Sequence, residues 1–574
     1  MPVVLGLNCY KHDSSAALVA DGRILAAAEE ERFERKKHYS GYPRRAIEFV
    51  LADAGLKAGD VDHVAYYMLP GLVFRENLAY SRHYIFRRGG LRFLAGQLAG
   101  ATKMRRIPST VRDHLTALRS DAAFHFVEHH RAHAWAAMAC SGWDSAAVLT
   151  MDGVGERDTS LLGEAGENGL RVISRSRFPH SPGILYSALT AYLGFRPDND
   201  EYKVMGLSSY GEPEYLELFR RMIHHDGGRV VVDTDLADIH MGVWGSSMTE
   251  EALRELGPPR RKGEEIGQRH MNIAASMQTA LEETGLGLAR WLRERTDSPR
   301  LVVSGGVGLN CVMNGLLERE SGFEEVYPLP PSHDAGTSLG AAVAVHRQLG
   351  AGTPASPGNM FLGSSYSATE MEDALRTAKI PYTAPEGLAA RVAEMLSRGL
   401  IVAVFTGRME FGPRALGARS ILADPRRQDM KDIVNRYVKH REEFRPFAPV
   451  VLRQRAGEYF IGCSDSPYMI KTYPVAESKR DEIPSVTHVD GTARVQTIER
   501  EDNPFYHDVV AEFDRITGVP VLMNTSFNVR GEPIVESPLD AIRCAFGTGI
   551  DALAMPPFLV VKREAAEHSN GDGN

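Results

Sequence analysis

Two histidines and two aspartates have the side-chain types and the spacing of a metal site. His129 and His133 lie four residues apart in the motif HHRAH, at the head of an alanine-rich helical stretch. Residues four apart share one helical face, so both imidazoles can reach one ion. Asp152 in MDGVGE and Asp334 in PSHDAGTS complete a set of four if these turns line one cleft. Such mixed ligands suit Fe(II), Mn(II) or Zn(II), and the alternative is a polar helix start with incidental histidines.

The C-terminal half holds a different set of side chains, suited to bind an anion. Arginine presents a rigid fork that matches phosphate or carboxylate oxygens, and such charge-assisted bonds are about twice as strong as neutral ones. The arginines stand among Gly, Pro and Phe in turn-like segments rather than on charged helical faces, which favours an anion pocket over ordinary surface arginines. The set comprises Arg414, Lys439, Arg445, Arg494, Asn524, Ser526 and Asn528.

A third pattern is a glycine loop between a predicted strand and a predicted helix. The apolar run at residues 301–304 leads into SGGVGLN, and a helical stretch follows from Cys311. Glycines let a backbone approach a nucleotide closely, and a helix N-terminus offers unpaired N–H groups to an anion. The loop therefore indicates nucleotide binding, although a glycine turn can also serve only to tighten packing.

The elements that must position these residues form a repeated pattern. Residues 3–29 read as strand, polar turn, strand, Asp21-Gly22 turn and strand, and residues 146–177 read the same way around Asn168-Gly169. An Asx-Gly pair between apolar runs is the strongest short hairpin signal. Helical stretches follow each pattern. The sequence thus predicts a duplicated α/β unit whose two sheets face one another across a cleft, with both polar turns aimed at a shared ligand.

Length and composition indicate a folded protein of more than one domain. The chain has 574 residues, with 66 Lys and Arg against 74 Asp and Glu, for a net charge of −8. Residues 350–361 are rich in small residues, Pro and Gly, and they read as a linker. We therefore expect an N-terminal domain over residues 1–352, a second α/β domain over residues 360–565 and a disordered tail over residues 566–574.

Cysteine spacing and charge distribution exclude some classes of protein. The five cysteines lie far apart without C-x-x-C spacing, which argues against a disulfide framework or a cysteine-based zinc site. No secretory signal or long apolar run is present, so we expect a cytoplasmic protein without a membrane partner. The segment from Arg75 to Arg119 carries ten Lys or Arg against two acidic residues. It is either a solvated surface insertion or a lid that steers an anionic substrate.

A series of motifs runs in order along almost the whole chain: HDSSAAL, AEEERFERKKH, HHRAH, MDGVGE, SGGVGLN, PPSHDAGTSLGAA, GPRALGARS, VKHREEFRPFAP and NTSFNVRGEPIV. Together they resemble the NodU/CmcH-type O-carbamoyltransferases. The resemblance implies an actin-like ATPase (RNase H-like) N-terminal domain and a C-terminal α/β domain similar to the YrdC threonylcarbamoyl-AMP synthases. It also implies that carbamoyl phosphate and ATP, with Mg, give carbamoyl-adenylate and pyrophosphate. The carbamoyl group then passes to a hydroxyl of a small-molecule acceptor, an antibiotic or sugar-containing natural product.

The resemblance assigns roles to individual residues. It puts His12 at the transfer site, as a general base or to orient the acceptor. His129, His133, Asp152 and Asp334 are expected to bind Fe(II) or another divalent metal, and the seven C-terminal residues to hold carbamoyl phosphate and the phosphates of ATP. The residues expected at the adenylate are Lys37, Gly183, Gly305, Gly306, Gly308 and Asn310. The expected partners are carbamoyl phosphate, ATP and the acceptor, without nucleic acid, and a homodimer is left open.

Two other functions stay open at this point. A tRNA threonylcarbamoyltransferase would share both domain types, but it needs a nucleic-acid surface, which the net charge of −8 disfavours. A nonenzymatic actin-like ATP-binding regulator would use the cleft only as a conformational switch, and the C-terminal arginines and HHRAH would then have no purpose.

Overall fold

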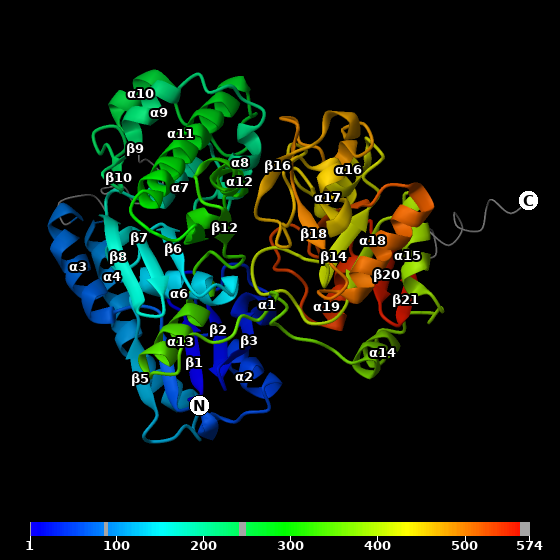
Figure 1. Cartoon of the computed structure of the whole chain (residues 1–574), viewed down its shortest axis with the longest axis horizontal. Coiled ribbons are helices and arrows are strands. Elements are labelled where there is room, and N and C mark those ends of the chain that lie inside the picture. The colour runs from blue at the N-terminus through cyan, green and yellow to red at the C-terminus, as the bar shows by residue number, and fades with distance from the viewer. Residues whose placement is uncertain (1, 85–89, 240–247, 563–574) are drawn as a thin grey trace, which may run out of the picture. The chain divides into compact units, whose positions relative to one another are not determined.

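The computed structural model describes residues 2–84, 90–239 and 248–562, apart from the side chains of residues 80–93, and it divides into two compact units. The first unit comprises Met1–Glu30 and His38–Gly358, and the second comprises Glu31–Lys37 and Asn359–Asn574. The predicted tail at residues 566–574, and part of the basic segment, lie outside the described residues. Figure 1 colours the chain from one end to the other.

The first unit contains two five-stranded sheets with the same strand order. One sheet runs β3-β2-β1-β4-β5 and the other β8-β7-β6-β11-β12, and in each the first three strands are antiparallel while the last three are parallel. This identity of order confirms the predicted duplication. The strands are β1 (Val4–Asn8), β2 (Ser15–Ala20), β3 (Arg23–Glu29), β4 (His63–Tyr66), β5 (Ala123–Phe126), β6 (Ala146–Met151), β7 (Asp158–Gly166), β8 (Gly169–Arg177), β11 (Arg300–Ser304) and β12 (Glu325–Pro328).

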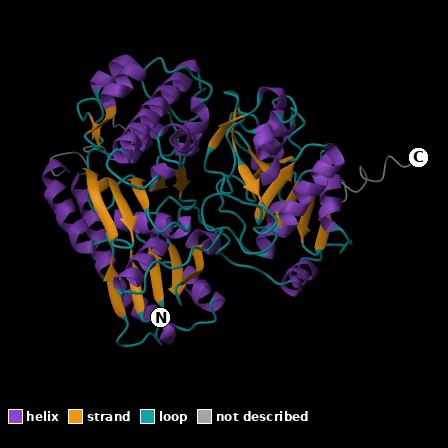
Figure 2. Ribbon diagram, viewed as in Figure 1, coloured by secondary structure: helices purple, strands orange, loops and turns teal. Residues whose placement is uncertain are grey.

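Two helices, α6 (His129–Ser141) and α13 (Gly336–Gln348), pack against each other between the sheets. Helix α13 contacts β1, β2 and β4, whereas α6 contacts β6 and β11. The sequence predicted that the two sheets face each other across a cleft. This prediction is wrong, because the two helices fill the space between the sheets. Small residues permit this packing, because a Cβ at Gly340 would lie 1.7 Å from the Ala132 carbonyl oxygen. Figure 2 distinguishes these helices and strands by colour.

The remaining helices of the first unit surround this core or extend from it. Helix α2 contacts β2 and β3, and α11 contacts α8, α9 and α12. A short two-stranded sheet joins β9 (Ile223–Asp226) to β10 (Arg229–Val232). No helix within the described parts of the chain is both long enough and apolar enough to cross a bilayer. The helices are α2 (Arg44–Asp53), α3 (Pro70–Tyr84), α4 (Gly90–Arg105), α5 (Ile107–His114), α7 (Pro182–Tyr192), α8 (Glu201–Ser208), α9 (Leu216–Met222), α10 (Glu250–Leu256), α11 (Gln268–Arg293) and α12 (Cys311–Glu320).

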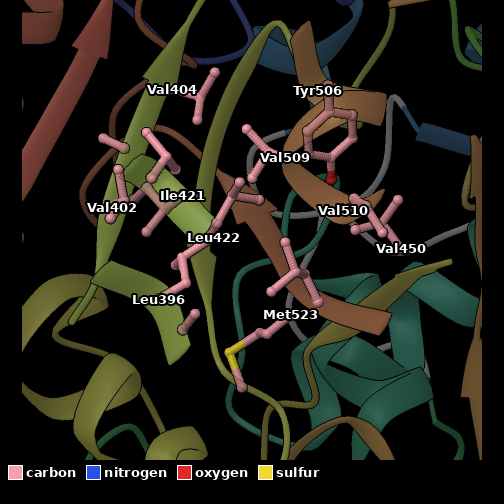
Figure 3. Close-up of a cluster of buried hydrophobic side chains, with 14 of the residues drawn as sticks. Leu396, Val402, Val404, Ile421, Leu422, Val450, Tyr506, Val509, Val510 and Met523 are labelled. Carbon is pink, nitrogen blue, oxygen red and sulfur yellow. The ribbon is translucent and has the colours of Figure 1, made fainter. Parts of the chain in front are cut away.

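The second unit is built on a seven-stranded mixed sheet ordered β18-β15-β19-β14-β13-β20-β21. Helices α15 (Leu388–Ser397) and α18 (Pro504–Thr517) pack against each other, and α18 also packs against β15 and β19. Figure 3 shows Leu396, Val509 and Val510 of these helices in one cluster with apolar side chains of the sheet. The strands are β13 (Val402–Phe405), β14 (Arg419–Ala423), β15 (Ala448–Leu452), β18 (Gln496–Ile498), β19 (Val521–Ser526), β20 (Ala552–Met555) and β21 (Phe558–Val561).

Shorter elements complete the second unit. A two-stranded sheet joins β16 (Thr472–Pro474) to β17 (Thr492–Arg494). A π-helical turn, Val434–Lys439, follows α16 and ends at His440, whose φ is +46°. The remaining helices are α14 (Ala368–Thr377), α16 (Met430–Ile433), α17 (Ala456–Tyr459) and α19 (Pro538–Phe546).

One segment from the N-terminal part of the chain belongs to the second unit. Helix α1 (Glu30–Glu34) follows β3, and residues 31–37 pack with the second unit before the chain returns at His38. Arg32 donates to the carbonyl of Gly412 at 2.7 Å, and Arg35 donates to the carbonyl of Ile534 at 2.6 Å. We call residues 31–37 the crossover segment.

Candidate metal and anion sites

The structure brings His129, His133, Asp152 and Asp334 together in the first unit. One ligand atom from each side chain lies within 4.8 Å of the others. His129 Nε2 lies 2.9 Å from an Asp152 carboxylate oxygen and 3.2 Å from His133 Nε2, and both Nε2 atoms lie 3.7 Å from Asp334 Oδ1. A tetrahedral site with metal–ligand bonds of about 2.0–2.2 Å has ligand–ligand distances in this range. We call these residues the four-ligand cluster.

Neighbouring groups orient the ligands of this cluster. The backbone N–H of Gly306 donates to Asp152 Oδ1 at 2.8 Å, which leaves Oδ2 directed toward His129. Ser304 Oγ lies 3.2 Å from Nδ1 of His133 and holds that ring with Nε2 toward the cluster. Hydrogen bonds to the ligating side chains fix the orientation of metal ligands in proteins. The donor types and their supports therefore fit a divalent cation of the Fe(II), Mn(II) or Zn(II) class.

His130, the third histidine of HHRAH, has a different environment. Its Nδ1 lies 2.7 Å from Thr150 Oγ1 and its Nε2 lies 2.8 Å from the carbonyl of Asp158. Burial, followed by the charge of His129, lowers the pKa of His130 to about 3. His130 is thus a neutral side chain that fastens α6 to the second sheet.

The four-ligand cluster forms where parallel strands of both sheets end. Asp152 directly follows β6, His129 begins α6 three residues after β5, and Gly305 follows β11. Glycine is required at position 305, where φ is +91° and a Cβ would lie 2.2 Å from the Met151 carbonyl oxygen. The carboxyl ends of parallel strands are the usual place for sites in α/β proteins.

His12 lies in a second group of polar side chains, in the turn after β1. Its Nδ1 lies 2.6 Å from Asp13 Oδ2, and its Nε2 lies 3.1 Å from the carbonyl oxygen of Asp198. Both partners can only accept, so both ring nitrogens carry a proton. Burial lowers the pKa of His12, but the charge of Asp13, its hydrogen bond to His12 and the charges of Asp334 and Asp198 together outweigh burial and raise the pKa to about 10.

Asp13 holds a second histidine with its other oxygen. His38 Nδ1 lies 2.8 Å from Asp13 Oδ1, and the rings of His12 and His38 lie 4.9 Å apart. Burial raises the pKa of Asp13, but His12 and His333 outweigh it and hold that pKa well below its usual range. Asp13 and His38 both have positive φ, at +47° and +55°. Asp13 thus holds the cationic imidazole of His12 in the first unit.

Spacing in the sequence did not reveal two further polar residues beside the four-ligand cluster. Lys11 donates to the carbonyl of Gly155 at 2.9 Å, and the carboxylates of Asp334, Glu156 and Asp152 oppose the lowering of its pKa by burial. Glu156 accepts from the backbone N–H of Leu69 at 2.7 Å and from that of His129 at 3.3 Å. The polar turn after the first strand was the available signal for Lys11.

The remaining residues expected at the adenylate in the first unit have structural contacts. A Cβ at Gly183 would lie 2.8 Å from the backbone nitrogen of Gly153, and one at Gly308 would lie 2.9 Å from Ser332 Oγ. Asn310 caps α12 by accepting from the backbone N–H of Met313 at 3.0 Å. Gly306, beside these residues, orients Asp152. Nucleotide binding by these positions stays a prediction.

In the second unit, Lys439 lies among residues of the predicted anion site. Its Nζ lies 2.7 Å from the carbonyl of Ser526, 2.9 Å from the carbonyl of Asn528 and 2.7 Å from Asn528 Oδ1. An ammonium group has three protons, so these oxygens use all of its donors. Burial and then Arg441 lower the pKa of Lys439 well below its usual range, and Arg445 and Lys37 add to this effect. Lys439 therefore shapes the turn at residues 526–528 within a positively charged environment.

Asn524 on β19, another residue of the predicted anion site, is held by hydrogen bonds to two other segments. Asn524 donates to the carbonyl of Ala415 at 3.1 Å and to Gln496 Oε1 at 2.7 Å. Ala415 directly follows Arg414, and Gln496 lies two residues after Arg494. Asn524 therefore connects β19 to the segments that contain these two arginines. Arg445 lies 3.9 Å from Glu442. Lys37 reaches the second unit through the crossover segment.

Family models and curated proteins match this chain over most of its length. A model described as "Carbamoyltransferase N-terminus" matches residues 3–343, and one described as "Carbamoyltransferase C-terminus" matches residues 393–562. Nodulation protein NolNO of Sinorhizobium fredii is 38% identical over 97% of this chain and 80% of its own. The 3'-hydroxymethylcephem-O-carbamoyltransferase of Amycolatopsis lactamdurans is 27% identical over 95% of this chain and 96% of its own. An uncharacterised protein of Synechocystis is 39% identical over 98% of this chain and 97% of its own.

Proposed function

The chain belongs to the carbamoyltransferase family of enzymes, and from that premise we propose that it is an ATP-dependent O-carbamoyltransferase acting on a small-molecule hydroxyl. The observation that carries this proposal is the pairing of two sites within one family member. The first unit has a buried cluster of metal-ligand types, and the second has a buried lysine beside further cationic side chains. One site suits carbonyl activation and the other suits phosphate binding.

The proposed first reaction uses the second unit. Carbamoyl phosphate and ATP give carbamoyl-adenylate and pyrophosphate, and atom balance requires that the phosphoryl group of carbamoyl phosphate leaves as inorganic phosphate after uptake of one water. Lys439 and Ser526 form the turn that receives the phosphates, with Arg445 and Lys37 adding positive charge. The remaining members of this proposed set are Arg414, Arg494, Asn524 and Asn528. A YrdC-like fold for this unit remains part of the proposal.

The proposed second reaction uses the first unit, whose repeated strand order supports the actin-like fold. A divalent metal at His129, His133, Asp152 and Asp334 would supply Lewis-acid polarisation of the carbamoyl carbonyl. Gly306 and Ser304 hold two of these ligands in place, and Lys11 contributes a positive charge nearby.

We propose that His12 acts beside the carbamoyl carbonyl as an imidazolium, with both ring nitrogens protonated. With acceptors on both nitrogens, its imidazolium can donate to the leaving group or orient the acceptor. For His12 to act as a general base, the acceptor hydroxyl must replace the Asp198 carbonyl at Nε2. As long as the Asp198 carbonyl occupies Nε2, His12 is better suited to donate a proton or to orient the acceptor than to act as a base.

The acceptor is proposed to be a hydroxylated natural product, because relatives include a cephem O-carbamoyltransferase and nodulation proteins. A tRNA acceptor is disfavoured by the net charge of −8. A nonenzymatic regulator is disfavoured by membership of an enzyme family whose N-terminal and C-terminal models both match this chain.

Pyrophosphate release tests the proposal most directly. Purified protein is incubated anaerobically with ATP, Mg and carbamoyl phosphate, without any acceptor, and with either Fe(II) or a chelator. We expect pyrophosphate and inorganic phosphate only when carbamoyl phosphate is present. Formation of ADP in place of pyrophosphate would contradict the adenylate route. A tRNA-binding assay provides the control for the nucleic-acid alternative.

A further inference from the structure

Tyr67 is a buried polar side chain that the proposed function leaves unexplained. It directly follows β4, its side chain is fully buried, and its hydroxyl has no hydrogen-bond partner within the described part of the chain. The neighbouring Tyr66 is equally buried, but its hydroxyl donates to the carbonyl of Cys9 at 2.7 Å. Buried hydroxyl groups are nearly always hydrogen-bonded, because an unmade bond costs their full desolvation.

The surroundings of Tyr67 belong to the four-ligand cluster. Its ring meets that of His129 edge to face, with centroids 5.5 Å apart and planes at 62°. Burial raises the pKa of Tyr67, and the charges of Asp334, Glu156 and Asp152 raise it further. A phenol is protonated at neutral pH in any case, so Tyr67 offers a hydrogen-bond donor beside His129 of the cluster.

Two of the nearby carboxylates already have partners of their own. Asp152 accepts from Gly306 and faces His129, while Glu156 accepts from Leu69 and His129. The two tyrosines thus differ in one respect: the Tyr66 hydroxyl donates to the backbone, whereas the Tyr67 hydroxyl has no partner among the described residues.

We propose that the Tyr67 hydroxyl donates a hydrogen bond to an oxygen of the ligand bound at the four-ligand cluster. This inference rests on the proposed function, in which that oxygen is the carbonyl oxygen of the carbamoyl group. Attack by the acceptor hydroxyl converts this carbonyl into a tetrahedral centre whose oxygen becomes negative. A preorganised donor in a site without bulk water stabilises that charge, as oxyanion-hole donors do. Tyr67 would then be a catalytic residue, a hydrogen-bond donor to the same oxygen that a metal held by the cluster would polarise.

The first test compares the unfolding of two matched variants without metal or substrate. Tyr66→Phe removes a hydrogen bond to the Cys9 carbonyl and should lower the denaturant midpoint. Tyr67→Phe removes a hydroxyl that has no partner among the described residues, so its midpoint should equal or exceed that of the parent protein. An equal loss in both variants would overturn the inference, because it would show that Tyr67 has a structural hydrogen bond.

The second test measures ligand binding on the metal-loaded protein. Bicarbonate, a planar oxyanion of the size of a carbamoyl group, is titrated into Co(II)-substituted protein and followed by visible absorption. Tyr67→Phe should raise the Kd for bicarbonate about tenfold or more, while Tyr66→Phe leaves it unchanged. The same Kd in Tyr67→Phe and parent protein would overturn the inference. Absence of Co(II) binding in the parent protein would instead overturn the proposed metal site, and the unfolding comparison would still decide whether the Tyr67 hydroxyl lacks a protein partner.

Discussion

The Nε2 atoms of His129 and His133 face each other at 3.2 Å, one turn apart on α6. Only one of two such nitrogens can donate to the other, and the same pair also faces the carboxylate of Asp334 at 3.7 Å. A cation between the four ligands satisfies the lone pairs of both rings and the carboxylate charges together. The His129–His133 distance therefore leads directly to a metal-binding prediction.

We predict about one tightly bound divalent metal per chain. Asp152→Asn keeps the shape of the side chain but removes its charge, and it should lower metal content at least tenfold. Metal analysis of anaerobically purified protein measures this. His130→Gln is the matched control, because His130 contacts Thr150 and Asp158 instead, and its metal content should equal that of the parent protein.

Removal of the metal should also destabilise the first unit. A ligand that binds only the folded state raises stability by mass action, so chelation should lower the thermal midpoint of the parent protein. The Asp152→Asn protein should show little further change with chelator. A parent protein whose midpoint is the same with Fe(II) and with chelator would contradict a structural contribution of the metal.

Lys439 should be essential for the first half-reaction. Lys439→Ala leaves the carbonyls of Ser526 and Asn528 without their buried donor, so the turn at residues 526–528 loses its shape. We expect carbamoyl-phosphate-dependent pyrophosphate release to fall by roughly 100-fold or more. Arg436→Ala removes an exposed charge from the same π-helical turn and should change the rate little. Normal release by Lys439→Ala would refute its assigned role.

Lys37 should affect the same half-reaction despite its place near the N-terminus. The crossover segment carries it into the second unit, where its charge lowers the pKa of Lys439. Lys37→Met should raise the KM for ATP or carbamoyl phosphate about tenfold, whereas Lys36→Met, at an exposed neighbour, should not. Steady-state kinetics of pyrophosphate release distinguishes the two. Equal kinetics in both variants would remove Lys37 from the anion site.

His12 should make stability depend on alkaline pH. The pKa of His12 rises from 6.5 to about 10 in the folded protein, so the folded state holds a proton that the unfolded state has lost. Its contribution is fully present below pH 6.5 and disappears as the pH rises toward 10. Urea unfolding of His12→Gln should therefore show a flatter fall across this window than the parent protein. His224→Gln, at an exposed site on β9, should match the parent slope.

Local patterns predicted much of this architecture because their physical causes are local. The Asp21-Gly22 and Asn168-Gly169 pairs occur between antiparallel strands, and the glycine loop joins β11 to α12 as expected. Helical periodicity was enough to group His129 with His133. The sequence could also suggest that Asp152 and Asp334 join them, since both stand in similar polar turns.

Other features depended on packing between distant parts of the chain. Nothing local in AEEERFERKKH tells which unit this helical segment packs against, and the contacts of Arg35 lie almost 500 residues away. The placement of α6 and α13 between the sheets follows from a backbone approach at Gly340, which depends on a partner helix. Tyr67 and Lys11 likewise acquire their significance only from the cluster they adjoin.

The crossover segment makes the two units inseparable as genetic modules. The chain passes between them at Glu30, again at Lys37 and a third time at Gly358. A gene fragment that begins at Asn359 therefore encodes a second unit without residues 31–37, and one that ends at Gly358 includes a helix whose packing partners are missing. Recombination at a single junction therefore cannot exchange either unit intact.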